Sequence, residues 1–322
     1  MAGGGGGLTA ISREDILAAR AAIGGRLHRT PIFSSRALSE RIGANAHLKA
    51  ELFQRTGSFK PRGMLTKLAS LSAEEKARGV VTWSAGNAGQ GAAFAARELG
   101  IACRVFMWRT ANPIKVAACR GYGAEVDLES EGPAEAHERL LAFTDESGAT
   151  FVHPFDDPVL QTGYGGLGLE ILEDVPAVDV IIVPIAGGGL IAGVASAVDV
   201  RVVGVEPELA PTATRALEAG HPVEIQPRSI ADGLGAPFTG EHTLSVVKER
   251  VDGVVLVSEE EIAEAMRFLY GRAKLACEPA GATSTAALLT GKVKLEPGSE
   301  VVALISGGNA DPKVAAAILG EA

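Results

Sequence analysis

The chain has 322 residues, of which 47% are hydrophobic and 21% are charged, and its formal net charge is −9. Such proportions are typical of a globular protein with a substantial core. The acidic balance argues against a nucleic-acid partner, because phosphate backbones are bound by clustered Lys and Arg. No apolar run has the length of a membrane span, so we expect no membrane partner. Three cysteines without metal-ligand spacing and no secretory signal predict a cytoplasmic protein.

Residues 1–9 contain a glycine run, which predicts a flexible tail. Further along, helix starts are expected where a serine is followed three residues later by an acidic residue, the capping-box pattern. The pattern occurs at Ser12 with Asp15, Ser72 with Glu75, and Ser258 with Glu261. Gly79 and Gly100 stand where the carboxyl ends of helices are expected.

Short apolar β-branched runs alternate with helix-like stretches over most of the chain. The expected strands are residues 80–82, 103–108, 124–128, 150–153, 178–184, 201–206 and 301–305. This alternation predicts an α/β fold with parallel sheet. No linker rich in Pro or Ser divides the chain, so a second domain would be an insertion. We expect residues 80–153 to form this small domain, and 10–79 with 154–322 to form the large one.

Three glycine-rich turns each follow an apolar run: WSAGNAGQG at 83–91, PIAGGGLIAG at 184–193 and LISGGNAD at 304–311. In open parallel sheets, such turns lie at the carboxyl ends of strands, where ligands bind. The second turn favours phosphate, because glycine N–H groups and a helix N-terminus both attract anions. Its spacing matches neither a P-loop nor GxGxxG. A tight turn that needs glycine for packing is the equally weighted alternative.

Single residues in these segments carry candidate chemistry. The amine of Lys60, in RTGSFKPRG, can form a Schiff base with a carbonyl, although most lysines are solvated surface residues. The turn at 84–88 offers a hydroxyl, an amide and N–H groups that suit a carboxylate. The alternative is an ordinary helix cap by Ser84 or Asn87. Ser306 would either hydrogen-bond a ring nitrogen or cap the next helix.

Taken together, these segments resemble the fold-type-II pyridoxal-phosphate enzymes, specifically the threonine/serine dehydratase and serine racemase group. RTGSFKPRG is similar to the Schiff-base segment, SAGNAGQG to the asparagine loop and AGGGL to the phosphate loop. Further matches follow in the family's order: FVHPFDDP (151–158), GVEPE (204–208), SIADGLG (229–235), CEPAGA (277–282) and ISGGN (305–309). The likeness runs from about residue 13 to 315. It implies two open parallel-type sheets with flanking helices, with pyridoxal 5'-phosphate in the cleft between a large and a small domain.

The resemblance also implies a role for each matching residue. Lys60 would be the Schiff-base lysine and the catalytic base, and Phe59 would lie along the pyridine ring. Asn87 would bond the phenolic oxygen of the ring, and Ser306 its nitrogen. The implied cofactor-binding set is Phe59, Lys60, Asn87, Ala186, Gly187, Gly188, Gly189, Leu190, Glu278 and Ser306. The implied substrate-binding set is Ser84, Ala85, Gly86, Ala88 and Tyr164.

The chain departs from the family's pattern at several of these positions. Ala85 stands where serine racemases carry a serine that acts on the second face of the substrate. Without a proton donor there, dehydration is favoured over racemisation. Ala88 replaces a frequent His, and Tyr164 stands where Gln is common, which would admit a larger β-hydroxy amino acid.

Some members of the family bind a divalent cation through a Glu, a backbone carbonyl and an Asp. Glu206 and Ala210 match the first two ligands, but Thr212 replaces the Asp. The loss of a charged oxygen ligand weakens a site for a hard cation. The sequence therefore disfavours a bound Mg²⁺ or Mn²⁺.

The expected function is a pyridoxal-phosphate ammonia-lyase that converts L-threonine or L-serine to 2-oxobutanoate or pyruvate and ammonia. Lys60 would remove the Cα proton, the β-hydroxyl would leave, and the enzyme would form a homodimer. The alternatives are a serine racemase, a lyase for 3-hydroxyaspartate or phenylserine, and a β-replacement synthase. From another class, the chain could be a silent binding protein that keeps the fold.

Overall fold

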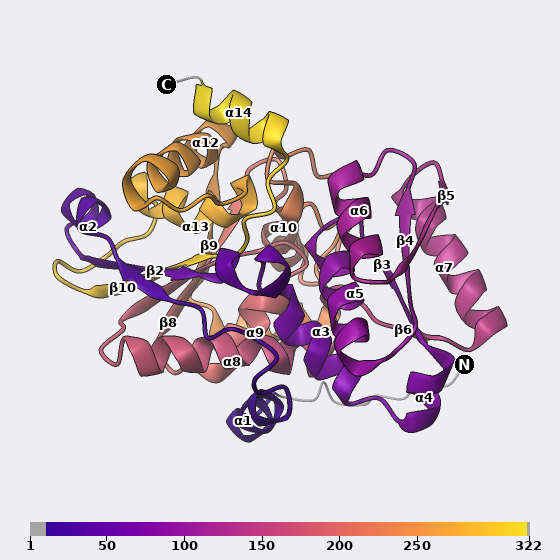
Figure 1. Cartoon of the computed structure of the whole chain (residues 1–322). Helices are drawn as coiled ribbons and strands as arrows, with labels where there is room; N and C mark the ends of the chain where they lie inside the picture. Colours follow the sequence, from indigo (N-terminus) through magenta and orange to yellow (C-terminus); the bar gives the residue numbers. More distant parts are fainter. Residues whose placement is uncertain (1–10, 321–322) are drawn as a thin grey trace.

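The computed structural model describes residues 11–320, so the tail predicted for residues 1–9 lies outside the described residues. The strands form two separate sheets, one of six strands and one of four, which lie side by side in Figure 1. Helices cover both sheets, which confirms the expected α/β class with open parallel-type sheets. None of the helices within residues 11–320 is long and apolar enough to cross a membrane.

The six-stranded sheet has the order β1-β2-β10-β7-β8-β9. In that order the strands span Ile32–Ser34, Asn45–Ala50, Glu300–Ile305, Val180–Pro184, Arg201–Pro207 and Gly253–Val257. Neighbouring strands are parallel except β1 and β2, which pair antiparallel. The sequence did not predict β1, β2 or β9. β2 reads NAHLKA, and its Lys49 interrupts the apolar run although it is fully buried.

Both faces of the six-stranded sheet are buried under helices. In β7, Ile181 and Val183 point into one apolar cluster, and Val180 and Ile182 point into the other. This alternation follows from the period of two along a strand. Helices α1, α3, α8 and α9 cover the first face, and α2, α12 and α13 cover the second, as Figure 1 shows. A continuous apolar run such as VIIVP is therefore explained by burial on both sides.

The four-stranded sheet has the order β5-β4-β3-β6, and all of its pairs are parallel. In that order its strands span Glu125–Ser130, Cys103–Trp108, Val80–Trp83 and Thr150–Phe151. Helices α5 and α6 pack on one face and α7 on the other. All four strands come from residues 80–151, within the range expected for a small inserted domain. The exact domain boundaries stay a prediction.

The helices that bear on the site are α3, α5, α8 and α9, and α5 contributes to the cores of both sheets. In chain order the helices α1 to α14 span Arg13–Ala22, Arg36–Ile42, Lys60–Ala69, Ala73–Arg78, Asn87–Leu99, Pro113–Gly121, Pro133–Ser147, Pro158–Asp174, Gly189–Ala197, Thr212–Ala219, Glu241–Arg250, Glu259–Phe268, Pro279–Leu289 and Pro312–Gly320. The three expected capping boxes form at the starts of α1, α4 and α12. Gly79 and Gly100 end α4 and α5 as expected.

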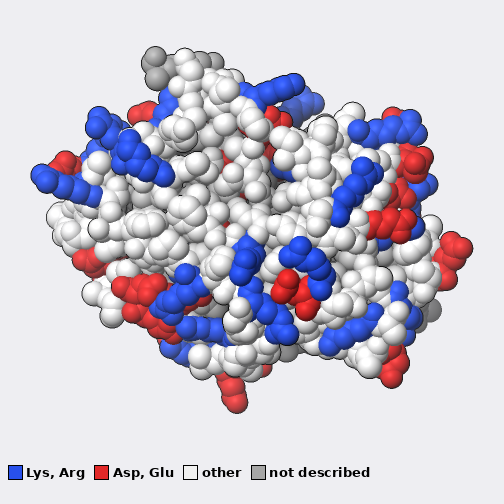
Figure 2. Space-filling model, in the orientation of Figure 1, with Lys and Arg blue, Asp and Glu red and all other residues white. Residues whose placement is uncertain are grey.

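Charged side chains of both signs are interspersed over the face shown in Figure 2. Lys and Arg lie beside Asp and Glu around the rim, and the described residues of this face present no broad region of a single sign. Ion pairs such as Arg104 with Glu125 and Arg36 with Glu40 contribute to this pattern.

Candidate active site

Lys60 is the first residue of α3, and the segment before it is hydrogen-bonded to the turn after β10. The N–H of Phe59 donates to the carbonyl of Ser306 at 3.1 Å. Ser58 and Gly307 form an isolated antiparallel bridge. The lysine segment and the third glycine turn thus pair like two short strands, although they are far apart in the sequence. This pairing places Lys60 at the carboxyl end of the six-stranded sheet.

The amine of Lys60 is held inside the molecule rather than in solvent. Its Nζ donates to the carbonyl oxygen of Pro154 at 2.8 Å. It also lies 5.2 Å from the centre of the Phe59 ring. Burial lowers the pKa of the Lys60 amine to about 8, because a low-dielectric environment disfavours the charged form. A lysine of this kind has a neutral fraction at physiological pH that a surface lysine lacks.

The second glycine turn connects β7 to α9 and is closed to any side chain. Gly188 has φ +85°, and a Cβ there would lie 2.2 Å from the methyl of Thr243. At Gly187 a Cβ would lie 2.3 Å from the ring of Phe155. Helix α9 begins at Gly189 without a side-chain cap. The turn needs glycine for packing, and the start of α9 behind it carries no side-chain cap, a geometry that suits a phosphate. Phosphate binding by this turn stays a prediction.

The first glycine turn leads from β3 into α5, whose N-cap is Gly86. Neither Ser84 nor Asn87 caps this helix. The hydroxyl of Ser84 accepts the N–H of Gly86 at 3.1 Å. The side chain of Asn87 donates to Glu278 at 2.6 Å and accepts from Asn309 at 2.8 Å. The start of α5 therefore has no side-chain cap, and it lies next to the third turn through the Asn87–Asn309 hydrogen bond. Anion binding there stays a prediction.

Asn309 was not assigned a role from the sequence, although it lies within the ISGGN segment. Its amide nitrogen donates to the carbonyl of Thr56 at 2.7 Å and to the side-chain oxygen of Asn87 at 2.8 Å. It therefore connects the lysine segment, the first turn and the third turn. One sequence signal could have identified Asn309: it is a polar residue directly after two glycines, close to the end of a buried strand.

Ser306 and Glu278 complete the polar groups near the third turn. Ser306 follows β10 directly and is 4% exposed. Helix α14 begins only at Pro312, so Ser306 does not cap it. Burial and the nearby Asp232 raise the pKa of Glu278 to about 7. Its Oε2 has no hydrogen-bond partner within residues 11–320, so this buried oxygen is available to a ligand or to a proton.

Three residues expected to touch substrate lie in apolar surroundings. Ala85 packs against the cluster that contains Val105 and Met107 in the four-stranded sheet. Ala88 belongs to the cluster around α3 and α8 and is 5% exposed. Tyr164 is fully buried, with its ring 4.9 Å from that of Phe59. Substrate contacts by these side chains stay a prediction. In this structure the ring of Tyr164 packs against that of Phe59.

The residues considered for a divalent cation lie at the end of β8 and the start of α10. The two oxygens of Glu206 accept the N–H groups of Ala213 and Thr214 at 2.6 and 2.9 Å. This arrangement satisfies the carboxylate at the start of α10. The hydroxyl of Thr212 donates to the carbonyl of Ala236 at 3.1 Å. Within residues 11–320, no group of three or more His, Cys, Asp or Glu side chains is placed to hold a metal ion.

The donor set around the three turns fits a phosphorylated pyridine aldehyde. An uncapped helix behind glycines suits its phosphate, and a lysine amine with a pKa of about 8 suits its aldehyde. A model of the pyridoxal-phosphate dependent enzyme family matches residues 24–307. The chain belongs to this family. Its cofactor is pyridoxal 5'-phosphate, and it is an enzyme of the lyase type rather than a member of a nucleotide-binding family.

Individual relatives agree with this membership. The chain is 44% identical to an L-threonine ammonia-lyase of Thermotoga maritima, over 94% of this chain and 76% of that protein. It is also 44% identical to a catabolic L-threonine dehydratase of Staphylococcus aureus, over 94% of this chain and 90% of the relative.

Solved structures give the same fold. Maize serine racemase matches with a TM-score of 0.92 and 34% identity, covering 97% of this chain and 98% of that one. A threonine deaminase from T.th. matches with a TM-score of 0.87 and 41% identity, covering 93% of this chain and 99% of that one. The expected resemblance to the threonine/serine dehydratase and serine racemase group is thereby confirmed.

Proposed function

We propose that this enzyme is an ammonia-lyase for L-threonine and L-serine. The observation that carries the proposal is the Lys60 amine, held by the Pro154 carbonyl with a pKa of about 8 beside an uncapped glycine turn. The family's cofactor supplies an electron-withdrawing ring that makes the Cα–H of an attached amino acid acidic. Every other requirement of the reaction falls to residues of this chain.

Binding comes first, and it uses two helix starts. The backbone of Ala186, Gly187, Gly188, Gly189 and Leu190 holds the phosphate at the start of α9. The hydroxyl of Ser84 and the N–H groups at the start of α5 hold the substrate carboxylate. Phe59 supports the ring, and Asn87, Glu278 and Ser306 are its polar neighbours. These roles are the ones that the resemblance implies, and the placement of the residues around the three turns supports them.

Proton transfer is the task of Lys60. Its neutral amine removes the Cα proton, and the pKa of about 8 keeps a useful neutral fraction near physiological pH. Loss of the Cα proton and the β-hydroxyl amounts to elimination of water. The enamine that leaves the enzyme then hydrolyses to a 2-oxo acid and ammonia. The carbonyl of Pro154 orients the amine before and after this transfer.

Serine racemisation is the second candidate, because the fold matches that of maize serine racemase with a TM-score of 0.92. Racemisation needs a proton donor on the face of Cα opposite Lys60. Ala85 offers only a methyl group, and it packs against the core of the four-stranded sheet. The absence of a hydroxyl at this position favours elimination.

The test is 2-oxo acid formation by the purified enzyme across L-threonine, L-serine, 3-hydroxyaspartate and phenylserine, with and without Mg²⁺, together with a chiral assay of serine. We expect 2-oxo acid from L-threonine and L-serine, and neither turnover nor the visible absorbance of bound cofactor in Lys60→Ala. Accumulation of D-serine with little 2-oxo acid would favour the racemase. Bound cofactor without turnover of any substrate would favour the silent binding protein.

Three further features belong to the proposal. The enzyme works in the cytoplasm, forms a homodimer and has its domain boundaries at residues 79–80 and 153–154. Light scattering of the purified protein measures the oligomeric state. Limited proteolysis with and without cofactor measures whether residues 80–153 behave as one unit.

A further inference from the structure

Residues 153–156 form a tight turn after β6, within the segment FVHPFDDP. The ring Nδ1 of His153 accepts the N–H of Asp156 at 2.8 Å and the N–H of Phe155 at 3.3 Å. A backbone N–H can only donate, so this Nδ1 is an acceptor and carries no proton. The strand expected over 150–153 ends at Phe151. The backbone N–H groups that follow His153 donate to its ring instead of to a neighbouring strand.

This turn contacts both parts of the proposed cofactor site. The carbonyl of Pro154 accepts the Lys60 amine at 2.8 Å. The ring of Phe155 fills the space over Gly187, and its carbonyl oxygen lies 2.4 Å from where a Cβ of Gly189 would be. A shift of the turn would therefore move two groups together: the Pro154 carbonyl that binds the Lys60 amine, and the Phe155 atoms that pack against the phosphate turn.

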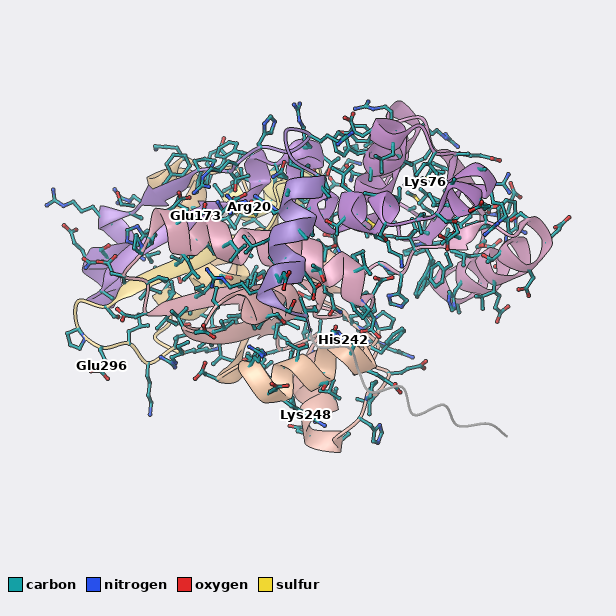
Figure 3. The ribbon with its side chains drawn as sticks, turned by 90° about the horizontal axis from the view of Figure 1, so that it is seen from below. Arg20, Lys76, Glu173, His242, Lys248 and Glu296 are labelled. Atoms are coloured by element: carbon teal, nitrogen blue, oxygen red, sulfur yellow. The ribbon has the colours of Figure 1, made fainter. Side chains whose placement is uncertain are left out.

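The far side of the turn is fixed by neighbouring helices. The side-chain nitrogen of Gln161 donates to the carbonyl of Phe155 at 3.0 Å, and its oxygen lies 2.6 Å from Nδ1 of His242. His242 lies in α11 and is buried, in the lower half of the molecule in Figure 3. Asp156 accepts the N–H of Thr243 at 3.3 Å. The turn is thus hydrogen-bonded to Gln161 and Thr243 of neighbouring helices. His153 holds it from within, by accepting the N–H of Asp156.

His153 lies among aromatic rings, with that of Phe155 at 4.5 Å, Phe151 at 5.7 Å and Phe238 at 6.3 Å. Burial lowers its pKa to about 4. The charged and titratable groups that face it are Asp156 and Asp157, which favour its protonation, and Lys60 and His137, which oppose it. Burial, the largest cause, keeps the ring neutral at physiological pH.

We propose that unprotonated His153 is a positioning residue that sets the Lys60 amine and the phosphate turn through residues 154–156, and that its protonation loosens both. The inference rests on the proposed roles of Lys60 and the phosphate turn. The simpler alternative is that His153 only fills an aromatic cluster. A phenylalanine would then serve equally well, which makes the two explanations separable.

The first experiment measures the affinity of the cofactor-free protein for pyridoxal 5'-phosphate by visible absorbance titration. His153→Asn retains a side-chain acceptor that can receive N–H groups two and three residues on, and His153→Phe retains only the ring. We expect His153→Phe to bind about tenfold more weakly, the loss typical of one or two hydrogen bonds, and His153→Asn to stay within about threefold of wild type. The opposite ranking would overturn the proposal.

The second experiment follows urea unfolding of the cofactor-free protein as a function of pH. The folded pKa of about 4 lies below the ordinary value of His. The unfolded chain therefore takes up a proton that the folded chain does not, and stability falls as pH drops from about 6.5 towards 4. His153→Asn cannot titrate, so its stability should fall less over this interval. Identical pH dependence in both proteins would contradict the role of protonation.

His137→Asn is the matched control, because His137 stacks on Trp83 at 4.8 Å in the same aromatic row but accepts no N–H from this turn. It should keep wild-type cofactor affinity. The wild-type protein separates the two proposals. If it binds no cofactor or forms no 2-oxo acid, the proposed function fails. If it does both and His153→Phe is indistinguishable from it, only the positioning role fails.

Discussion

The two glycine turns that would bind anions differ in how tightly the molecule holds them. The phosphate turn is pressed against Phe155 and Thr243, with no room for a side chain at Gly187 or Gly188. At Gly86, in the turn expected to hold the substrate carboxylate, the nearest atom to an added Cβ is the Ser84 hydroxyl at 3.8 Å. The phosphate turn therefore has no room for a side chain at these two glycines, whereas the first turn has room at Gly86, although Gly89 further along it would meet the Ser84 carbonyl at 2.7 Å.

A similar contrast appears between the ion pairs near the start of α3 and the ion pair between Lys115 and Asp232. On the cofactor side, Arg62 makes paired hydrogen bonds of 2.8 to 2.9 Å to both Glu51 and Glu170, and all three side chains are buried. Lys49 joins Glu170 at 2.7 Å. On the substrate side, the links to the large sheet include Lys115 with Asp232, whose side chain is 62% exposed. The ion pairs at the start of α3 are therefore buried, whereas the Lys115–Asp232 pair has one exposed partner.

Gly188→Ala should have the largest effect. Alanine would have to adopt a positive φ and place its methyl against Thr243, at a combined cost of about 3 kcal/mol. We expect cofactor affinity to fall about 100-fold. Gly86→Ala is the matched control on the substrate side and should keep cofactor affinity while raising KM. Equal losses of cofactor affinity in the two variants would break the comparison between the turns.

Glu170→Gln should follow. The substitution keeps the shape of the side chain but leaves Arg62 with Glu51 alone and Lys49 with the partly exposed Asp174, 3.9 Å away. The free energy of unfolding should fall by about 3 kcal/mol, because an uncompensated buried cation is costly. Glu173→Gln, one turn further along α8, is the control. Figure 3 shows Glu173 beside Arg20 at the surface, and this exposed pair contributes less than about 1 kcal/mol.

Asp232→Asn tests the corresponding contact on the substrate side. Asp232 pairs with Lys115, and because the Asp232 side chain is 62% exposed, the free energy of unfolding should fall by less than about 1 kcal/mol. Urea unfolding of the cofactor-free variants measures all three values. A loss at Asp232 as large as that at Glu170 would show that the cleft contacts are structural and that the two sides are held equally.

Lys60 gives an effect intermediate between those of Glu170 and Asp232, with a distinctive pH dependence. Its folded pKa of about 8 lies below the ordinary value of 10.5. The unfolded chain therefore binds a proton that the folded chain lacks between these pH values, and stability rises with pH across the interval. Below pH 8 the charged lysine costs about 2 kcal/mol, less than full burial implies because Lys60 is partly exposed. Cofactor-free Lys60→Met should lack this rise, and a parallel pH profile would contradict the lowered pKa.

The sequence predicted the local features that depend on neighbouring residues. The three capping boxes and the glycine ends of α4 and α5 form as expected, since each needs only residues three or four positions apart. It did not predict β2, because Lys49 reads as an exposed residue until Glu170 is known to lie beside it. It also missed His153 and Asn309, whose partners become visible only after residues distant in the sequence are brought together.

Ala85→Ser should have the smallest effect and tests the substrate side alone. The methyl of Ala85 packs against the core near Val105, so a serine hydroxyl there must turn towards the cleft or lose its hydrogen bonds. If it turns towards the cleft, it can return a proton to the face of Cα opposite Lys60. The ratio of D-serine to pyruvate should then rise severalfold with cofactor affinity unchanged, as measured by a chiral assay beside the 2-oxo acid assay. An unchanged ratio would mean that the core retains the side chain and that the preference for elimination is set by Lys60 and its turn.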